Sequence, residues 1–191
     1  METTLRQLPF DDVLDGLPVR EFRSWKGRKH YSGWYWSSTM GRHVVYESRL
    51  EMARILLADQ DPSVMRIAAQ PFLIEGVDDS GRIRRHVPDL LLETADAVLE
   101  LVDVKSYERL GDPKVAAQLA WTRRVCDQIG LACEVWSGAD PVFLANLSFL
   151  EPLSGSVAES SPADQCCGEV EESVVDVGAA FPSDGQPPVL V

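Results

Sequence analysis

The sequence lacks any long hydrophobic run, and no stretch approaches the length needed to cross a membrane. Its first residues, Met1 to Leu5, also lack the basic and then apolar layout of a secretory signal peptide. The four cysteines have neither the spacing of zinc ligands nor the density of a disulfide framework. We therefore expect a cytoplasmic protein with no membrane partner and no structural disulfides.

Basic residues are missing from the end of the chain. Residues 151–191 contain eight Asp and Glu residues but no Lys or Arg, and are otherwise rich in Ser, Gly, Pro and Ala. This composition cannot bury enough apolar surface to fold, so we expect a disordered acidic tail. Without these eight charges the formal net charge of −12 becomes −4 for residues 1–150, which carry all 18 Lys and Arg. The overall acidity therefore does not exclude a nucleic-acid partner, because the placement of basic residues matters more than their sum.

What remains is enough chain for one globular domain. Hydrophobic residues make up 45% of the sequence and charged residues 25%, which is ordinary for a protein with a full core. We divide the chain into an N-terminal arm (1–19), a domain (20–150) and the acidic tail (151–191).

Two long helices are predicted within this domain. The first covers residues 44–60, with Ser48 as a plausible N-cap and Glu51 at the capping-box position. We expect Leu50, Ala53 and Leu57 to form its apolar face. The second helix follows Asp112-Pro113 and runs to about Ile129, where Gly130 ends it.

Strands are predicted around residues 64–67, 71–75 and 131–136, and a short apolar helix from Pro141 to about Leu150. The order of helices and strands predicts an α/β domain with a mixed sheet flanked by helices. A strand, a long helix and another strand in succession imply one parallel crossover.

The chain is organised around residues 86–105. Two apolar runs of strand length, separated by polar residues 93–96, predict a β-hairpin that is buried on at least one face. Side chains alternate along a strand, so Asp103 and Lys105 should share a face while Val104 enters the core.

Strand pairing in this hairpin would bring Asp89 to the same edge as Asp103 and Lys105. Two carboxylates and one ammonium on rigid backbone suit the hydrolysis of a phosphodiester. The carboxylates are oxygen ligands for a hard cation such as Mg²⁺, and the ammonium can assist the attacking water or the developing charge. Either half of this pattern alone is more often just a solvated strand end, but together the two halves are more specific.

A basic and aromatic segment over residues 20–43 is a candidate DNA surface. Basic side chains contact phosphates, and aromatic rings can lie against sugars or unstacked bases. The alternative is a small strand layer that packs on the core and carries the basic residues for solubility. Two arginines that lead into the hairpin are further candidates, whereas the neighbouring His86 ranks below them. The predicted DNA-binding residues are Arg23, Lys26, Arg28, Lys29, Arg84 and Arg85.

These residues carry a family resemblance. Pro88-Asp89 followed by Asp103-Val104-Lys105 resembles the PD-(D/E)xK nuclease superfamily. Taken together, residues 20–150 resemble the catalytic domain of TnsA-like transposase endonucleases, through three further segments: Tyr46 to Glu51, Asp59 to Val64, and Gln70-Pro71.

The resemblance implies a restriction-endonuclease-like fold and a metal-dependent DNA endonuclease. Asp89, Asp103 and Glu51 would be ligands of Mg²⁺, with Mn²⁺ as a substitute, and Lys105 would orient and activate the attacking water. Glu47 is a rival for Glu51, which could also serve only to cap its helix. Cleavage would leave a 5′-phosphate and a 3′-hydroxyl.

The same resemblance implies partners. The protein would be the subunit of a heteromeric transposase that cuts the non-transferred strand of double-stranded DNA at transposon ends, beside a strand-transferase subunit. The resemblance also suggests a regulatory ATPase as a partner. The helical C-terminal domain that contacts this ATPase in such proteins is, however, replaced here by the acidic tail. Two alternatives stay open: a stand-alone restriction or repair nuclease, and a non-catalytic DNA-binding assembly subunit with a nuclease fold.

Overall fold

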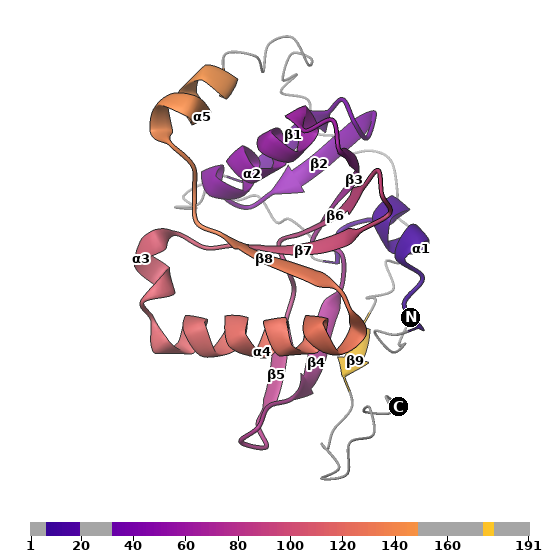
Figure 1. Ribbon diagram of the computed structural model, residues 1–191, viewed down its shortest axis with the longest axis vertical. Coiled ribbons are helices and arrows are strands. Elements are labelled where there is room, and N and C mark those ends of the chain that lie inside the picture. Colours follow the sequence, from indigo (N-terminus) through magenta and orange to yellow (C-terminus); the bar gives the residue numbers. More distant parts are fainter. Residues whose placement is uncertain (1–6, 20–31, 149–173, 178–191) are drawn as a thin grey trace.

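A computed structural model describes residues 7–19, 32–148 and 174–177 (Figure 1). The helices are α1 (Phe10–Asp15), α2 (Arg49–Gln60), α3 (Tyr107–Leu110), α4 (Pro113–Ile129) and α5 (Pro141–Ser148). The strands are β1 (Gly33–Ser37), β2 (Arg42–Tyr46), β3 (Val64–Ala69), β4 (Leu73–Val77), β5 (Ile83–His86), β6 (Leu90–Thr94), β7 (Leu99–Val104), β8 (Ala132–Trp136) and β9 (Val174–Val177). None of the helices described here is long and apolar enough to cross a membrane.

The central sheet has the strand order β3-β6-β7-β8. The β6–β7 hairpin is antiparallel, as predicted, and pairs Leu90 with Val102. β7 and β8 are parallel and joined through α4, which confirms the predicted crossover. The mixed α/β class is therefore confirmed. Two smaller sheets accompany it, with the orders β1-β2 and β5-β4-β9.

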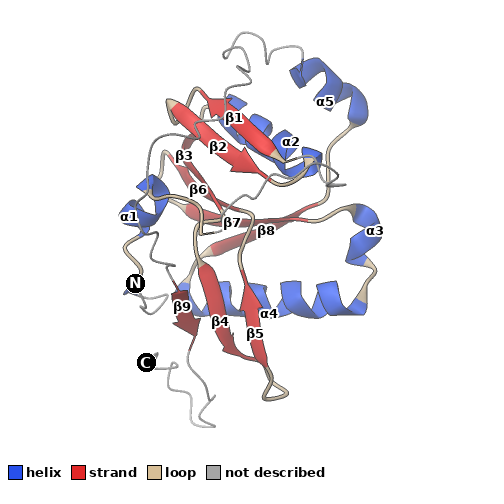
Figure 2. Cartoon of the chain, turned by 180° about the vertical axis from the view of Figure 1, so that it is seen from behind, coloured by secondary structure: helices blue, strands red, loops and turns tan. Residues whose placement is uncertain are grey.

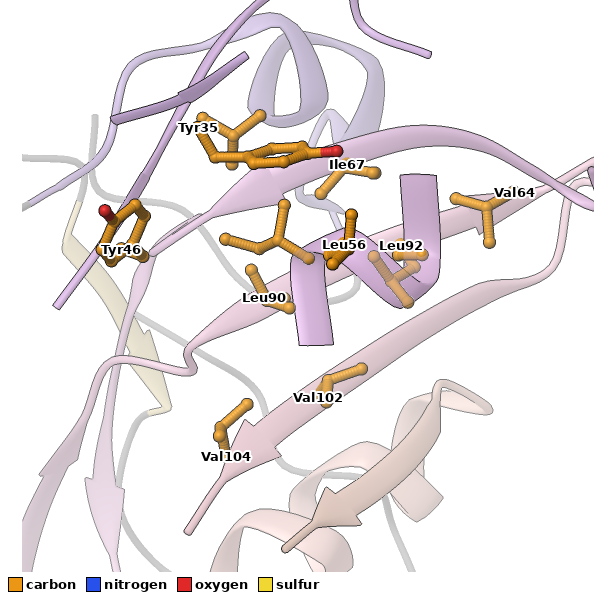
Figure 3. Close-up of a cluster of buried hydrophobic side chains, with 12 residues drawn as sticks. Tyr35, Tyr46, Leu56, Val64, Ile67, Leu90, Leu92, Val102 and Val104 are labelled. Atoms are coloured by element: carbon orange, nitrogen blue, oxygen red, sulfur yellow. The ribbon is translucent and has the colours of Figure 1, made fainter. Parts of the chain in front are cut away.

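Both faces of the central sheet are buried. α4 covers one face, where Leu91 and Leu101 pack with Trp121, and α2 covers the other (Figures 1 and 2). On the α2 face, Leu90, Leu92 and Val102 pack beneath the helix (Figure 3). Burial on both faces explains why the hairpin strands read as continuous apolar runs and not as alternating ones.

The first long helix is shorter than predicted. Residues 44–46 belong to β2 and pair with β1, and the helix starts only after the N-cap Ser48. Two β-branched valines and a tyrosine in succession favour a strand, so the wrong boundary came from extending the helical pattern over them. The predicted apolar face is right only for Leu50, which packs against the core, because the buried apolar residues of α2 are Ile55, Leu56 and Ala58. The β1–β2 hairpin packs against both α2 and β3, and Tyr35 lies in the same core cluster as Leu56 (Figure 3).

Asp59 fixes the β1–β2 turn to α2. Its carboxylate accepts hydrogen bonds from the Tyr35 and Ser37 hydroxyls at 2.9 and 2.6 Å, and from the backbone N–H groups of Ser38 and Thr39 at 3.0 and 2.9 Å. Burial acts to raise the pKa of Asp59, but these hydrogen bonds outweigh it and lower the pKa to about 2. The ionised carboxylate is therefore part of the folded structure.

Replacing Asp59 with Asn should lower the free energy of unfolding at pH 7 by about 2 kcal/mol, because the donors lose a charged acceptor. The folded-state pKa lies below the ordinary 3.8, so the stabilisation is complete above pH 3.8 and is lost as pH falls through about 2. Urea unfolding at pH 7, 4 and 2.5 should show the difference from wild type shrinking toward acid. The exposed Asp96→Asn is the matched control, and a difference independent of pH would contradict the assignment.

Segments from both ends of the chain pack against the domain. In the N-terminal arm, α1 packs on the core: Leu14 is fully buried, and Arg66 of β3 pairs with Asp11. In the acidic tail, predicted to be disordered, residues 174–177 instead form β9, a parallel strand along β4. The rest of the tail lies outside the described residues.

Candidate functional site

Asp89, Asp103 and Lys105 meet at the end of the β6–β7 hairpin, as predicted. Since Leu90 pairs with Val102, the register places Asp89 opposite Asp103 one residue further along. The Lys105 ammonium donates to Asp89 Oδ2 at 2.8 Å and to the Val104 carbonyl at 3.0 Å, and lies 4.0 Å from Asp103 Oδ1. Asp89 Oδ2 also accepts the Val104 N–H at 2.6 Å, which fixes the carboxylate to the strand end. Three oxygens from three residues thus surround one cation.

Asp103 is the most deeply buried member of this group, with a side chain only 1% exposed. Its Oδ1 lies 2.7 Å from His86 Nε2, whereas its Oδ2 has no hydrogen-bond partner. A buried carboxylate oxygen without a partner is costly, and a cation or a donor at that position would remove the cost. Val104 is buried on the α2 face, as predicted from strand alternation.

Glu51 lies at the start of α2, where Ser48 caps the helix and Glu51 reaches back to the residue before the cap. Its N–H donates to Ser48 Oγ at 3.1 Å, and its Oε2 accepts the Glu47 N–H at 2.7 Å. The Ser48 hydroxyl donates to the second oxygen, Oε1, at 2.9 Å. Ser48 is therefore confirmed as the N-cap, whereas the Glu51 carboxylate accepts the Glu47 N–H in place of the Ser48 N–H of a capping box, and both of its oxygens are engaged at the helix start.

The electrostatics of Glu51 link it to the same site. Burial is the main cause of a raised pKa, which the Glu47 N–H partly offsets, and the negative charge of Asp89 raises the pKa further. Glu51 is thus close enough to Asp89 for their charges to interact, although it forms no hydrogen bond or ion pair with Asp89 or Lys105.

Replacing Glu51 with Gln should increase stability at pH 7, because the Gln amide oxygen can still accept the Glu47 N–H and the substitution removes a charge that burial disfavours. The folded-state pKa lies above the ordinary 4.5, so this cost exists at neutral pH and vanishes below pH 4.5. If Glu51 also supports the cation, metal-dependent cleavage should fall about tenfold or more. Thermal unfolding at pH 7 and pH 4 measures the change in stability, and a nicking assay measures the change in cleavage. Cleavage at the wild-type rate would leave Glu51 with its capping role alone.

The predicted DNA-binding residues fall into two groups. Arg23, Lys26, Arg28 and Lys29 lie outside the described residues. Arg84 and Arg85 are described, and neither contacts the site.

Arg84 donates to Asp78 Oδ2 at 2.6 Å and faces Gln118 of α4. Arg85 points the other way along β5, is 69% exposed, and pairs with Glu75. His86, which sequence reasoning ranked below both, is the residue of β5 that contacts Asp103. Strand alternation places Arg84 and His86 on the same face of β5, so it does not favour His86 over Arg84, and no local pattern in the sequence indicates the contact of His86 with Asp103.

The site fits a hard cation only in part. Within the described ranges, no group of three or more His, Cys, Asp and Glu side chains converges as metal ligands. Asp89 Oδ2, the Val104 carbonyl and Asp103 Oδ1 do converge on the Lys105 ammonium, and the second oxygen of Asp103, Oδ2, is buried without a partner. This donor set suits Mg²⁺, which is commonly held by one or two carboxylates and keeps several waters. The residues present therefore fit the metal that the resemblance implies, with Glu51 as an outlying member.

Comparison with known proteins gives no match. The sequence matches no model of a known protein family, and no curated protein is significantly similar to it. The case for a function rests on the residues and their geometry.

Proposed function

We propose that the protein is a metal-dependent DNA endonuclease of the PD-(D/E)xK type. The observation that carries this proposal is the convergence of Asp89 Oδ2, the Val104 carbonyl and Asp103 Oδ1 on the Lys105 ammonium. Oxygens that surround an ammonium on rigid strand ends can also bind a hard divalent cation. The mixed sheet, with the hairpin at its centre and a helix on each face, supports the restriction-endonuclease-like fold that the resemblance implies.

In this proposal Asp89 and Asp103 hold the cation, and Glu51 adds negative charge next to them. A bound divalent cation supplies Lewis-acid stabilisation of the phosphate and a more acidic water. Lys105 stays beside these oxygens and orients the attacking water through its ammonium, which also stabilises the charge that develops on the phosphate. Its bond to Asp89 holds the ammonium in place before substrate arrives.

The biological setting in the proposal follows from the TnsA-like resemblance. The chain would cut the non-transferred strand at transposon ends, with double-stranded DNA and a strand-transferase subunit as partners. The test is nicking of supercoiled DNA by the full chain with Mg²⁺, with Mn²⁺ and with EDTA, alone and with a strand-transferase subunit. We expect cleavage that EDTA abolishes. Dependence on the partner would support the transposase role, and cleavage without it would favour a stand-alone nuclease.

A non-catalytic DNA-binding subunit is the second candidate. It is favoured by two observations: the Lys105 charge is already neutralised by Asp89, and both Glu51 oxygens are occupied by the helix cap. No cleavage with either metal, with or without the partner, combined with retained DNA binding, would decide for this candidate.

A further inference from the structure

Gln70 has an unusual backbone and an unusual side chain. It directly follows β3, and its φ of +48° lies in the left-handed region that residues other than Gly rarely adopt. The residue is only 3% exposed, and its amide oxygen Oε1 has no hydrogen-bond partner. Backbone strain and a buried partnerless oxygen each cost on the order of 1–3 kcal/mol. Such costs persist at a position only when the surrounding structure, or a function, requires them.

The surrounding structure holds the Gln70 backbone firmly. Its N–H donates to the carbonyl of Asp89 at 2.9 Å, and its own carbonyl accepts the Val19 N–H at 3.1 Å. Both backbone polar groups are thus satisfied, and the left-handed turn follows from where they are held. These bonds explain the backbone conformation, but they do not explain why the buried side chain is an amide.

The strand register aligns Gln70 with Asp89 and Asp103, so that these three residues form one row across the end of the central sheet. Ala69 pairs with Leu90, and Leu90 pairs with Val102, so the next residues outward are Gln70, Asp89 and Asp103. Adjacent strands lie about 4.8 Å apart, so this row puts Gln70 one strand from Asp89 and two from Asp103. Gln70 therefore stands at the same edge of the sheet, on the far side of Asp89 from Asp103.

The row contains two buried oxygens without a hydrogen-bond partner, and both are acceptors. In the part of the chain that the structure describes, the buried side-chain atoms without a partner are Gln70 Oε1, Asp103 Oδ2 and Gln118 Nε2. Gln118 belongs to α4 and faces Arg84 on β5. The other two belong to the row and can be satisfied only by a donor or a cation, not by an anion.

We propose that Gln70 is a further residue of this site and that its amide oxygen is a ligand of the divalent cation bound by Asp89 and Asp103. This inference rests on the proposed function. A neutral amide oxygen is a normal ligand of hard cations, and it adds coordination without adding negative charge beside two carboxylates. A purely structural residue at this buried position would be better served by an apolar side chain of similar size, which would bury no partnerless oxygen.

The test compares Gln70→Leu and Gln70→Glu with wild type by Mn²⁺ binding, measured by electron paramagnetic resonance or calorimetry, and by thermal unfolding without metal. The exposed Gln60→Leu is the matched control. Gln70→Leu should bind Mn²⁺ about 10- to 100-fold more weakly, with an unfolding temperature no lower than that of wild type. Gln70→Glu keeps an oxygen and adds a charge, so it should bind Mn²⁺ at least as tightly as wild type.

Four results would overturn the inference. Wild-type Mn²⁺ affinity in Gln70→Leu would remove Gln70 from the site while leaving the proposed function intact. A markedly lower unfolding temperature for Gln70→Leu, or equal losses of affinity in both variants, would assign the amide to packing. A wild-type chain that binds no Mn²⁺ would overturn the inference and the proposed cation site together.

Discussion

Replacing Lys105 with Met should lower metal-dependent nicking by about 10²- to 10⁴-fold, the range expected for loss of a group that handles the reacting water. The same variant should bind Mn²⁺ at least as tightly as wild type. The reason is that the ammonium lies 2.8 Å from Asp89 Oδ2 and 3.0 Å from the Val104 carbonyl, where a cation would bind. Met keeps the aliphatic stem of the side chain but removes the competing charge. Catalysis and metal binding should therefore change in opposite directions.

The stability of the variant is a second measure of the competition between the Lys105 ammonium and the divalent cation for the same oxygens. Without metal, Lys105→Met leaves Asp89 with only the Val104 N–H, and should lose about 1–3 kcal/mol. A divalent cation would replace the missing positive charge, so Mn²⁺ should raise the unfolding temperature more in the variant than in wild type. The exposed Lys114→Met is the matched control for both assays. Nicking at the wild-type rate would refute the role of Lys105. Loss of Mn²⁺ binding in a folded variant would show that the ammonium does not lie on the cation's ligands.

The site could be predicted from the sequence because its members are close along the chain. Asp89, Asp103 and Lys105 belong to one hairpin, whose register follows from two apolar runs and the polar break between them. The Ser48 cap of α2 and its bonds with Glu51 are equally local. Both features needed only short-range rules, and the structure contains them.

What the sequence could not supply depends on contacts between distant segments. His86 reaches Asp103 only because β5 approaches the central strands, a placement that no local pattern specifies. Asp59 lies in the last turn of α2 and holds the β1–β2 turn, 20 to 22 residues earlier in the chain, through its carboxylate. The left-handed backbone of Gln70 follows from bonds to Asp89 and Val19. Each of these roles arises from tertiary packing, which overrides local preference.

Replacing Asp89 with Asn should lower metal-dependent nicking by more than about 100-fold. Loss of a residue that only hydrogen-bonds to a metal ligand typically costs roughly 10- to 100-fold, and Asp89 is proposed to be a ligand itself. In contrast to Lys105→Met, this variant should also lose Mn²⁺ affinity. The fold should survive, since an Asn oxygen at the same position can still accept the Val104 N–H that Asp89 Oδ2 accepts now at 2.6 Å. Circular dichroism and thermal unfolding check this point before the nicking and binding assays.

The control for Asp89 is Asp96→Asn, the same substitution at the exposed turn of the same hairpin, which should nick and bind like wild type. The two site variants then separate the two roles that the geometry combines. Loss of cleavage with unchanged Mn²⁺ affinity in Asp89→Asn would mean that Asp89 acts by holding the Lys105 ammonium, and that the cation is bound elsewhere. Wild-type nicking by Asp89→Asn would remove the catalytic site from this hairpin altogether. If the divalent cation and the Lys105 ammonium use the same oxygens at this strand end, Asp89→Asn must lose both cleavage and Mn²⁺ binding. Lys105→Met must then lose cleavage but retain Mn²⁺ binding.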